Sequence, residues 1–300
     1  MESITEAVIE RDASVLCSPD DMLSFKLLNH VLGSGSSSRV FAAVNLSTGQ
    51  RVACKKYDLT DLSSGYDLRS TARKEAAILQ RLSSRYIPEP IAFSETSSSA
   101  YIFLELLNDS KTMDKELRKT GGVFDEARAR EHFVQLVDAV EHLHAQGIVH
   151  RDIKLENILL DRANGCAKLI DFGLSDYLFE DGSTLTEAVA EERVFDAYCG
   201  SPLYLAPEMC QQKPYRGRPV DIWSLGVVLY KMIQGRFPFG GESASQVFAR
   251  IVNKQLSFSA SRVISPELKD LLAKLLEKDP SKRATFQEIK QHPWITLAPC

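Results

Sequence analysis

The first third of the chain has a different hydrophobic pattern from the remainder. Short β-rich runs, bounded by Gly-Ser and Ser-Thr-Gly turn signals, predict strands there. These runs are 31–33, 39–44, 51–55, 90–93 and 101–104. Between the third and fourth runs, 68–82 places apolar residues at spacings of three and four, which predicts a helix. The pattern therefore predicts a small, mostly antiparallel sheet that carries one helix.

In the rest of the chain the apolar residues recur mainly at helical spacing. One predicted helix, 125–144, has an apolar face, and 220–233 is apolar almost all round, as expected of a helix buried inside a lobe. Ser265 before a proline predicts the start of a further helix. A capping box at Thr285 predicts the start of the last helix, which we expect to end before Pro293.

A chain of 300 residues exceeds a typical single core, so the change of pattern is the natural boundary between two lobes. We predict an α+β fold in which a small β-rich lobe is followed by a larger, mostly helical lobe. The predicted parts are a polar lead-in at 1–23, the β-rich lobe at 24–107, the helical lobe at 108–295 and a C-terminal tail at 296–300.

The composition is that of an ordinary soluble globular protein, with 44% hydrophobic and 25% charged residues. A formal net charge of −4 gives no electrostatic reason to expect binding to nucleic acid or to an anionic membrane surface. No apolar run approaches the roughly 20 residues that cross a bilayer, so we expect no membrane insertion. The six cysteines are scattered without zinc-like spacing, which favours a reduced, cytoplasmic protein and leaves a nuclear location open.

The most informative motif is the octapeptide at 150–157, His-Arg-Asp-Ile-Lys-Leu-Glu-Asn, followed fourteen positions after its Asn by Asp171-Phe172-Gly173. The two segments supply a candidate base together with acidic and amide metal ligands. Phosphoryl transfer from ATP needs such groups, because the protein mainly positions the nucleophile and compensates charge with Mg²⁺. On these motifs the chain resembles a eukaryotic protein kinase catalytic domain of the Ser/Thr type over 25–295. The resemblance implies the bilobal protein-kinase fold.

The resemblance also implies a role for each polar residue of these motifs. Asp152 would accept the proton of the substrate hydroxyl, and Lys154 would neutralise the γ-phosphate of ATP. Asn157 and Asp171 would hold Mg²⁺. His150 would pack rather than react.

The β-rich lobe contains most of the residues that the resemblance assigns to ATP binding. Its glycine-rich turn can bring backbone N–H groups over a triphosphate, and a strand follows it, which excludes a dinucleotide-binding motif. Lys55 would contact the α- and β-phosphates and be held by Glu75. Ser38 departs from the family pattern, which has a third glycine there. The residues implied for the nucleotide are Leu32, Gly33, Ser34, Gly35, Val40, Ala53, Lys55, Glu75, Leu104, Glu105, Leu107, Leu159 and Asp171.

Two motif residues indicate which type of substrate residue accepts the phosphoryl group. Lys154 stands two residues after the Asp, as in relatives that act on Ser or Thr rather than on Tyr. Ser201 would bond both Asp152 and Lys154, as in the Ser/Thr version of the substrate-binding loop. The expected partners are therefore protein substrates that present Ser or Thr.

The finer resemblance is to the calcium/calmodulin-dependent and AMP-activated kinase group, through the segments 198–208 and 292–295. Glu156 matches an acid that contacts a substrate Arg in basic-directed relatives, which favours basic residues near the acceptor. Lys111 stands where such relatives often carry a second acid, and this weakens the expectation. The regulatory partner stays unknown.

The segment 171–208 departs from the family where AMP-activated relatives carry an activating Thr, because Ala197 stands at that position. Arg151 normally docks the added phosphate through charge-assisted hydrogen bonds. One hypothesis is that Asp196 or a nearby Glu replaces the phosphate, which would give activity without phosphorylation. The alternative is that a neighbouring hydroxyl is the true site. The candidates are Thr184, Thr186 and Tyr198.

Two other functional classes share this fold. A pseudokinase scaffold would lack a catalytic residue, whereas the lysine, base and both metal ligands implied by the resemblance are present. A small-molecule kinase would not need the protein-binding features of the segment 200–204 and Glu208. The sequence favours a protein kinase over both alternatives.

Overall fold

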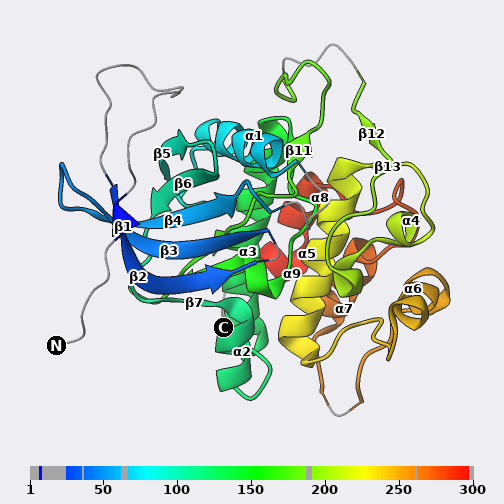
Figure 1. Cartoon of the computed structure of the whole chain (residues 1–300). Helices are drawn as coiled ribbons and strands as arrows, with labels where there is room; N and C mark the ends of the chain where they lie inside the picture. Colours follow the sequence, from blue (N-terminus) through cyan, green and yellow to red (C-terminus); the bar gives the residue numbers. More distant parts are fainter. Residues whose placement is uncertain are drawn as a thin grey trace. The chain divides into compact units, whose positions relative to one another are not determined.

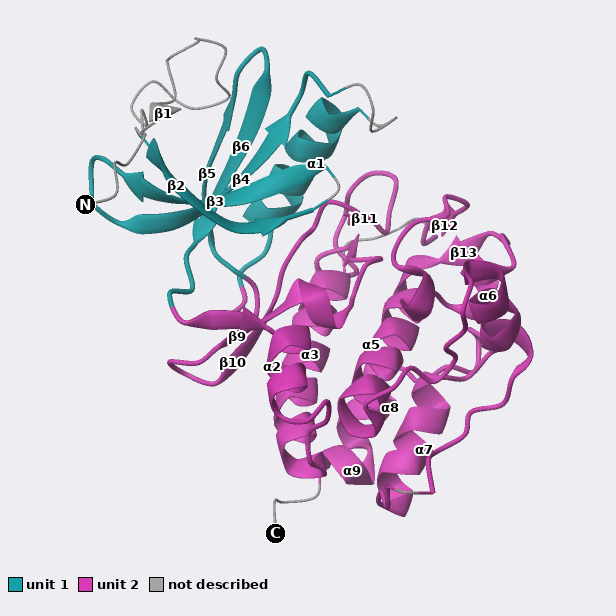
Figure 2. Ribbon diagram, turned by 60° about the horizontal axis from the view of Figure 1, so that its bottom comes forward, with its two compact units in different colours: residues 1–83, 88–108 teal, residues 84–87, 109–300 magenta. Residues whose placement is uncertain are grey.

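A computed structural model describes residues 7–8, 25–35, 37–61, 67–186, 191–260 and 262–296. The chain divides into two compact units (Figure 2). The first comprises residues 1–83 and 88–108, and the second comprises residues 84–87 and 109–300. Strands dominate the described part of the first unit and helices that of the second, which confirms the predicted α+β fold.

The first unit contains one antiparallel sheet with the strand order β1-β2-β3-β4-β6-β5 (Figure 1). Its strands are β1 (Ala7–Val8), β2 (Phe25–Ser34), β3 (Ser38–Asn45), β4 (Arg51–Asp58), β5 (Pro90–Glu95) and β6 (Ser99–Glu105). The five strands predicted from the sequence correspond to β2 to β6, and each extends beyond its predicted run. β1 lies inside the predicted polar lead-in and was not expected.

One face of this sheet carries the hydrophobic core of the first unit. Because side chains alternate along a strand, β4 directs Val52 and Cys54 to the core face and Lys55 to the opposite face. Phe25 stacks on Phe103 in this core, with ring centroids 3.8 Å apart. The other buried members of the cluster are Leu27, Ala43 and Tyr101. Lys55 is thus buried on the face that does not hold the core cluster.

Helix α1 (Leu68–Gln80) is the helix predicted for this unit and ends two residues before the predicted boundary. Its N-cap is Asp67, whose carboxylate accepts hydrogen bonds from the backbone N–H groups of Arg69 and Ser70 at 3.1 Å. The buried residues are Leu68, Ala72, Glu75, Ala76, Ile78 and Leu79. Glu75 is the one carboxylate in this otherwise apolar stripe.

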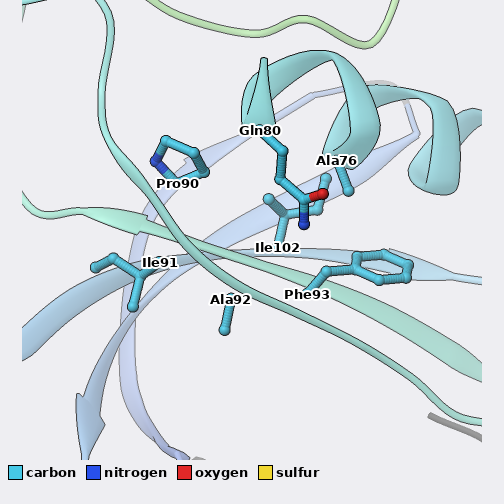
Figure 3. Close-up of a pocket in the computed structure, with 7 residues that line it drawn as sticks. All are labelled: Ala76, Gln80, Pro90, Ile91, Ala92, Phe93 and Ile102. Atoms are coloured by element: carbon cyan, nitrogen blue, oxygen red, sulfur yellow. The ribbon is translucent and has the colours of Figure 1, made fainter. Parts of the chain in front are cut away.

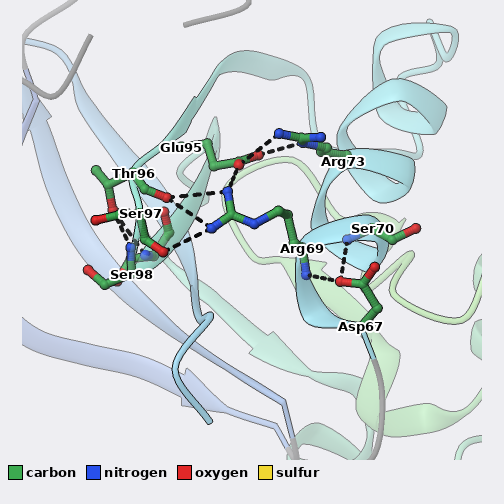
Figure 4. A network of polar contacts seen from close by, with 9 residues as sticks. Asp67, Arg69, Ser70, Arg73, Glu95, Thr96, Ser97 and Ser98 are labelled. Carbon is green, nitrogen blue, oxygen red and sulfur yellow. Dashed lines mark hydrogen bonds and ion pairs between the residues drawn. The ribbon is translucent and has the colours of Figure 1, made fainter. Parts of the chain in front are cut away.

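A charged network ties α1 to the turn between β5 and β6 (Figure 4). Glu95, at the end of β5, is 8% exposed and accepts hydrogen bonds from two arginines of α1. Arg73 donates to both of its oxygens, at 2.7 and 2.9 Å, and Arg69 also donates to it. Arg69 reaches further, to the backbone oxygen of Ser97 at 2.9 Å. These bonds hold the register of α1 against the sheet, and therefore the position of Glu75.

The second unit is built mainly from helices (Figure 2). They are α2 (Met113–Lys119), α3 (Glu126–Ala145), α4 (Pro207–Cys210), α5 (Gly217–Gln234), α6 (Ala244–Asn253), α7 (Pro266–Leu275), α8 (Phe286–Gln291) and α9 (Pro293–Thr296). The apolar face predicted for α3 is buried, and α5 is buried almost all round, as its pattern predicted. The capping signals at Ser265 and Thr285 start α7 and α8 as expected.

Short strands fix the loops of the second unit. One sheet has the order β10-β9-β7, and two further pairs are β11 with β8 and β12 with β13. Their bounds are β7 (Ser110–Thr112), β8 (Ile148–Val149), β9 (Ile158–Asp161), β10 (Cys166–Leu169), β11 (Asp176–Tyr177), β12 (Val194–Phe195) and β13 (Tyr215–Arg216). Two short 3₁₀ helices, η2 (Leu155–Asn157) and η3 (Pro202–Tyr204), lie between them along the chain.

Some elements were not expected from the sequence. Helix α6 buries only Val247 and Ile251, so its apolar stripe is too short to stand out in the pattern. Helix α8 ends before Pro293, as predicted. A further helix, α9, begins at Pro293 itself, because proline is well tolerated in a first helical turn. Among the residues that the structure describes, no helix is both long and apolar enough to cross a membrane.

Candidate active site

The 150–157 loop is anchored by a carboxylate of α5. Asp221 is completely buried and accepts hydrogen bonds from the backbone N–H groups of His150 and Arg151, both at 2.9 Å. Its Oδ2 also lies 2.9 Å from the ring Nε2 of His144. Burial, the largest influence, raises the pKa of Asp221, but the His144 and backbone contacts outweigh it and hold that pKa below its usual value. Arg151 has a φ of 65°, a left-handed backbone conformation that is strained for a residue with a side chain. Its hydrogen bond to Asp221 offsets this strain.

Asp152 is the centre of a four-residue hydrogen-bonded cluster. Lys154 Nζ donates to its Oδ2 at 2.6 Å, and Asn157 Nδ2 donates to the same oxygen at 2.9 Å. Ser201 Oγ donates to the other oxygen, Oδ1, at 3.1 Å, and accepts from Lys154 Nζ at 3.0 Å. The expected contacts of Ser201 with Asp152 and Lys154 are therefore present. Gly200 permits them: its φ is 98°, and a Cβ there would lie 2.8 Å from the backbone oxygen of Arg151.

The amide of Asn157 is oriented by Asp152. Its Nδ2 also donates to the backbone oxygen of Asp152 at 2.9 Å, so both amide hydrogens have an acceptor. The amide oxygen lies on the other branch of the side chain and remains available to a cation. The residue is buried, which limits alternative orientations.

Asp171 is held beside this cluster by its own neighbours. Ile170 N–H donates to the backbone oxygen of Asn157 at 2.9 Å, which joins the two segments predicted to bind metal. Phe172 packs edge-on against His150, with ring centroids 5.0 Å apart, so His150 packs against a neighbour as the resemblance implied. Asp171 has a φ of 65° and accepts from Gly173 N–H at 3.3 Å. A carboxylate and an amide oxygen suit Mg²⁺, which takes few protein ligands and keeps several waters.

The first unit holds the predicted lysine and its partner. Lys55 Nζ donates to both oxygens of Glu75, at 2.6 and 2.8 Å, and the two residues are 6% and 1% exposed. Tyr57 donates a further hydrogen bond to Glu75. Burial is the largest influence on Tyr57 and raises the pKa of its hydroxyl above the usual value, so Tyr57 stays a donor. Tyr57 was missed by sequence reasoning, although it lies two residues after Lys55 and therefore on the same strand face.

Most of the other residues implied for the nucleotide lie on strands of the first unit. Val40 pairs with Lys55 across β3 and β4, and Ala53 pairs with Leu104 across β4 and β6. Glu105 N–H donates to the backbone oxygen of Glu89 at 2.9 Å. Leu32, Gly33 and Ser34 end β2, and Leu107 is buried. Leu159 lies on β9 in the second unit. Their contact with adenine or phosphate stays a prediction.

The glycine-rich turn is closed by one backbone hydrogen bond. Gly35 N–H donates to the backbone oxygen of Ser38 at 2.9 Å. A Cβ at Gly33 would meet no atom within 4 Å, and neither Gly33 nor Gly35 needs a positive φ. The fold of this unit alone therefore does not require glycine at either position.

A small pocket in the first unit lies between α1 and the strands β5 and β6 (Figure 3). It is lined by Ala76 and Gln80 of α1 together with β5 and Ile102 of β6. Its volume is about 50 Å³, far below the several hundred cubic ångströms typical of a site for a small-molecule ligand. We assign it no role in nucleotide binding.

The acid that pairs with Arg151 is not the expected one. The guanidinium donates to Asp176 Oδ2 at 3.0 Å and to the backbone oxygen of Leu174 at 2.9 Å, and its centre lies 4.9 Å from the centre of the Phe195 ring. Asp196 is exposed and makes no ion pair with any described residue. The hypothesis that Asp196 takes the place of a phosphate is therefore wrong. The strand β11 brings Asp176 to this position, which linear spacing does not reveal.

The acidic residues near Asp196 have other partners. Glu192 is buried and accepts from Arg218 Nε at 2.8 Å, which ties the segment to α5. Glu191 lies 3.8 Å from Arg216. Further along the chain, Glu208 and Arg283 form a buried pair, at 2.8 and 3.0 Å.

The known protein kinase domain family matches residues 27–295 of this sequence. The chain belongs to that family. The match confirms the predicted resemblance and the fold that it implied. It covers the candidate residues of each unit: Lys55 and Glu75 in the first, and Asp152, Asn157 and Asp171 in the second.

Individual relatives are named kinases, and two of the following three are named serine/threonine kinases. CBL-interacting serine/threonine-protein kinase 13 of Arabidopsis thaliana is 34% identical over 269 residues, covering 89% of this chain and 50% of the relative. Serine/threonine-protein kinase ppk25 of Schizosaccharomyces pombe is 34% identical over 269 residues, covering 90% of this chain and 60% of the relative. The hormonally up-regulated neu tumor-associated kinase of Mus musculus is 36% identical over 266 residues, covering 88% of this chain and 35% of the relative. The chain spans about half the length of the first two of these relatives.

Proposed function

We propose that the protein is a serine/threonine kinase that transfers the γ-phosphate of ATP to hydroxyl groups of protein substrates. The observation that carries this proposal is the cluster around Asp152, in which Lys154, Asn157 and Ser201 all bond one carboxylate. A carboxylate so oriented can accept a proton from an incoming alcohol. A cytoplasmic or nuclear location also stays a proposal.

Each residue of the cluster has a separate proposed task. Asp152 orients the substrate hydroxyl and takes its proton as the oxygen bonds to the γ-phosphorus and ADP leaves. Lys154 already lies 2.6 Å from Asp152, so its ammonium group is close enough to offset negative charge on the transferring phosphoryl group. Ser201 joins the substrate-binding segment to the base. Small changes in these positions should be costly, because catalysis here depends mainly on positioning.

Asn157 and Asp171 are the proposed ligands of Mg²⁺. When bound, the metal ion compensates the negative charge of the phosphates. Asn157 would bind through its oxygen, since Asp152 holds the nitrogen. Asp171 would supply the carboxylate.

Lys55 is the proposed contact of the α- and β-phosphates. Glu75 and Tyr57 hold its ammonium group in one place, and burial keeps water from competing. The network of Glu95 with Arg69 and Arg73 supports the same geometry from the other end of α1.

Activity without phosphorylation of the 171–208 segment is part of the proposal. Arg151 and Arg193 both bond Asp176, and both guanidinium groups lie over the Phe195 ring, at 4.9 and 5.2 Å. An internal carboxylate and an aromatic face thus occupy the two cations that a phosphate would otherwise attract. The pairing of β12 with β13 and the bond from Tyr215 to the backbone oxygen of Ala197, 2.9 Å, hold the segment in place.

The test of the main function is direct. The purified chain is given ATP with a labelled γ-phosphate, Mg²⁺ and matched peptides whose acceptor is Ser, Thr or Tyr. We expect label on the Ser or Thr peptides and not on Tyr, and no label with a metabolite panel. A chain that transfers no label, and whose melting temperature ATP does not raise with or without Mg²⁺, would contradict the proposal and favour a scaffold.

The test of phosphorylation independence uses protein made in bacteria and treated with a phosphatase. We expect its activity to be retained. If activity is lost, the hydroxyl candidates regain priority, and Thr184→Ala, Thr186→Ala and Tyr198→Phe would identify the site.

A further inference from the structure

A strongly basic pocket lies in the second unit, where the end of α5 is followed by a loop and then by α6. Its volume is about 400 Å³. Four of its lining residues are cationic: Lys231, Arg236, Arg250 and Lys254. The others are Phe237, one proline and two glycines, so no acid lines it. We call this site the basic pocket. Its charge is opposite in sign to the net charge of −4 on the whole chain.

Two of the four cations of the basic pocket are oriented by neutral groups. Lys231 Nζ donates to the backbone oxygen of Gly235 at 2.7 Å and lies 4.9 Å from the centre of the Phe237 ring. Arg250 donates to the backbone oxygen of Gly240. None of the four cations forms an ion pair with a carboxylate among the described residues. Like charges gathered in this way repel one another, and an anion would relieve the repulsion.

The basic pocket is connected to the cluster around Asp152 through Tyr204. The Tyr204 ring packs edge-on against Phe237, with centroids 5.3 Å apart. Its hydroxyl accepts from Leu155 N–H at 3.4 Å and lies 3.5 Å from Glu156 Oε2. Tyr204 also ends the 3₁₀ helix η3, which directly follows Ser201. Both α5 and α6 contact η3.

Lys231 interacts electrostatically with a residue of the 150–157 loop. Burial, the largest influence, lowers the pKa of Lys231, and the charges of Asp114 and Glu156 act in the opposite direction. Glu156 is therefore close enough to Lys231 for their charges to interact. The Phe237 ring of the pocket lies 5.3 Å from the Tyr204 ring of η3, measured between centroids, and an extended peptide advances about 3.3 Å per residue, so a few residues reach from the acceptor to the pocket.

We propose that the basic pocket binds an anionic side chain of the protein substrate, a few residues from the phosphorylated Ser or Thr. The anion is a carboxylate of Asp or Glu or a phosphate already present on the substrate. Arginine and lysine bind both groups through charge-assisted hydrogen bonds. This inference rests on the proposed kinase function and specifies its substrate class.

The proposal differs from the preference expected from Glu156 alone. That residue is exposed and favours a basic substrate residue at its own position. The four cations of the pocket favour an acid at another position. The two preferences can be separated by scanning one substituent at a time along a peptide.

The experiment compares peptides that share one serine acceptor and differ at a single flanking position. Each position is filled in turn by Ala, Arg, Glu or phosphoserine, and kcat/KM is measured for the full chain. At one position we expect Glu or phosphoserine to raise kcat/KM by roughly tenfold over Ala, the size of one hydrogen bond to a charged group. A clear excess for phosphoserine over Glu assigns the site to phosphate, and equal values assign it to carboxylates.

A double variant and a matched control assign the preference to the pocket. Arg236→Glu combined with Lys254→Glu should bring the ratio of kcat/KM for acidic and neutral peptides close to one. Lys269→Glu changes an exposed cation on α7 that has no carboxylate partner among the described residues, and should leave the ratio unchanged. Melting temperatures of all variants verify that they are folded.

A binding measurement keeps the inference testable without turnover. Fluorescence anisotropy of a labelled phosphoserine peptide should show weaker binding to the double variant than to the wild type, and the difference should shrink as salt is added. Phosphorylation without an acid preference, or a preference that survives the double variant, would overturn the basic pocket and leave the kinase function standing. If no peptide is phosphorylated, the kinase function fails, and equal anisotropy for both proteins would then reject the pocket as well.

Discussion

Two lysine–carboxylate pairs, one in each unit, have the same length and different surroundings. Lys55 Nζ and Glu75 Oε1 are 2.6 Å apart, and so are Lys154 Nζ and Asp152 Oδ2. The first pair has side chains that are 7% and 1% exposed, whereas those of the second are 22% and 9% exposed. Distance alone therefore does not distinguish a pair that holds a structure from one that can take part in chemistry.

The difference lies in what each carboxylate can still do. Glu75 is occupied by Lys55 and Tyr57 in a buried site, so it can only hold the lysine in position. Asp152 shares its oxygens among several donors, and Lys154 keeps a partly exposed ammonium group beside it. The loss of a buried partner leaves an uncompensated charge, which is costly, whereas a partly exposed partner is replaced by water.

The largest effect should come from Asp152→Asn. The amide keeps the shape of the side chain but accepts no proton, so we expect kcat to fall by about 10²–10⁴-fold. The unfolding free energy should change little, because the surrounding donors keep an oxygen acceptor. Peptide phosphorylation and thermal unfolding measured on the same sample test both parts. A variant that retains wild-type kcat would remove Asp152 as the base.

The next largest effect should separate the two pairs by stability. Glu75→Ala removes the carboxylate to which the buried Lys55 donates two hydrogen bonds, and should lower the unfolding free energy by about 3–5 kcal/mol. Lys154→Ala removes a partly exposed partner and should lower it by about 1 kcal/mol or less. Urea unfolding of both variants provides the measurement. Equal losses would show that burial does not distinguish the two pairs.

The unfolding free energy should depend on pH through Asp221, which is buried like the carboxylate of the Lys55–Glu75 pair. Its pKa in the folded protein is below the usual value for Asp, so the ionised form stabilises the fold. This contribution is complete above the unfolded pKa, near 3.8, and is lost as the pH falls through the lower folded value. Unfolding free energies from pH 7 down to acid pH should therefore decline less steeply for Asp221→Asn than for the wild type. Parallel declines would contradict the assignment.

An effect smaller than that of Glu75→Ala should come from Tyr57→Phe. The change removes one hydrogen bond to Glu75 and leaves the Lys55 pair intact, so we expect a loss of about 1–2 kcal/mol in unfolding free energy. Tyr101→Phe is the control, because the Tyr101 hydroxyl has no hydrogen-bond partner among the described residues. If the two variants have the same unfolding free energy, the Tyr57 hydrogen bond contributes nothing to the stability of the fold.

Sequence reasoning succeeded where local patterns and short motifs contain the information. The strands β2 to β6, the helix α1 and the buried helix α5 follow from periodicity. The bonds of Asp152 with Lys154 and Asn157 join residues within one octapeptide. The partner of Arg151 was assigned wrongly, because Asp176 reaches it through the pairing of β8 with β11 rather than through nearness in the sequence.

By itself the sequence determined the order of the main strands and helices, the resemblance to the family and the motif residues that carry the proposed chemistry, because periodicity and motif spacing are local properties of the chain. Only the tertiary structure decided which charges meet. It brought Asp176 to Arg151, Tyr57 to Glu75, and the cations at the end of α5 and on α6 to one pocket. Such contacts depend on how separate elements pack, and the strength of a charge pair depends on burial, which no linear pattern contains.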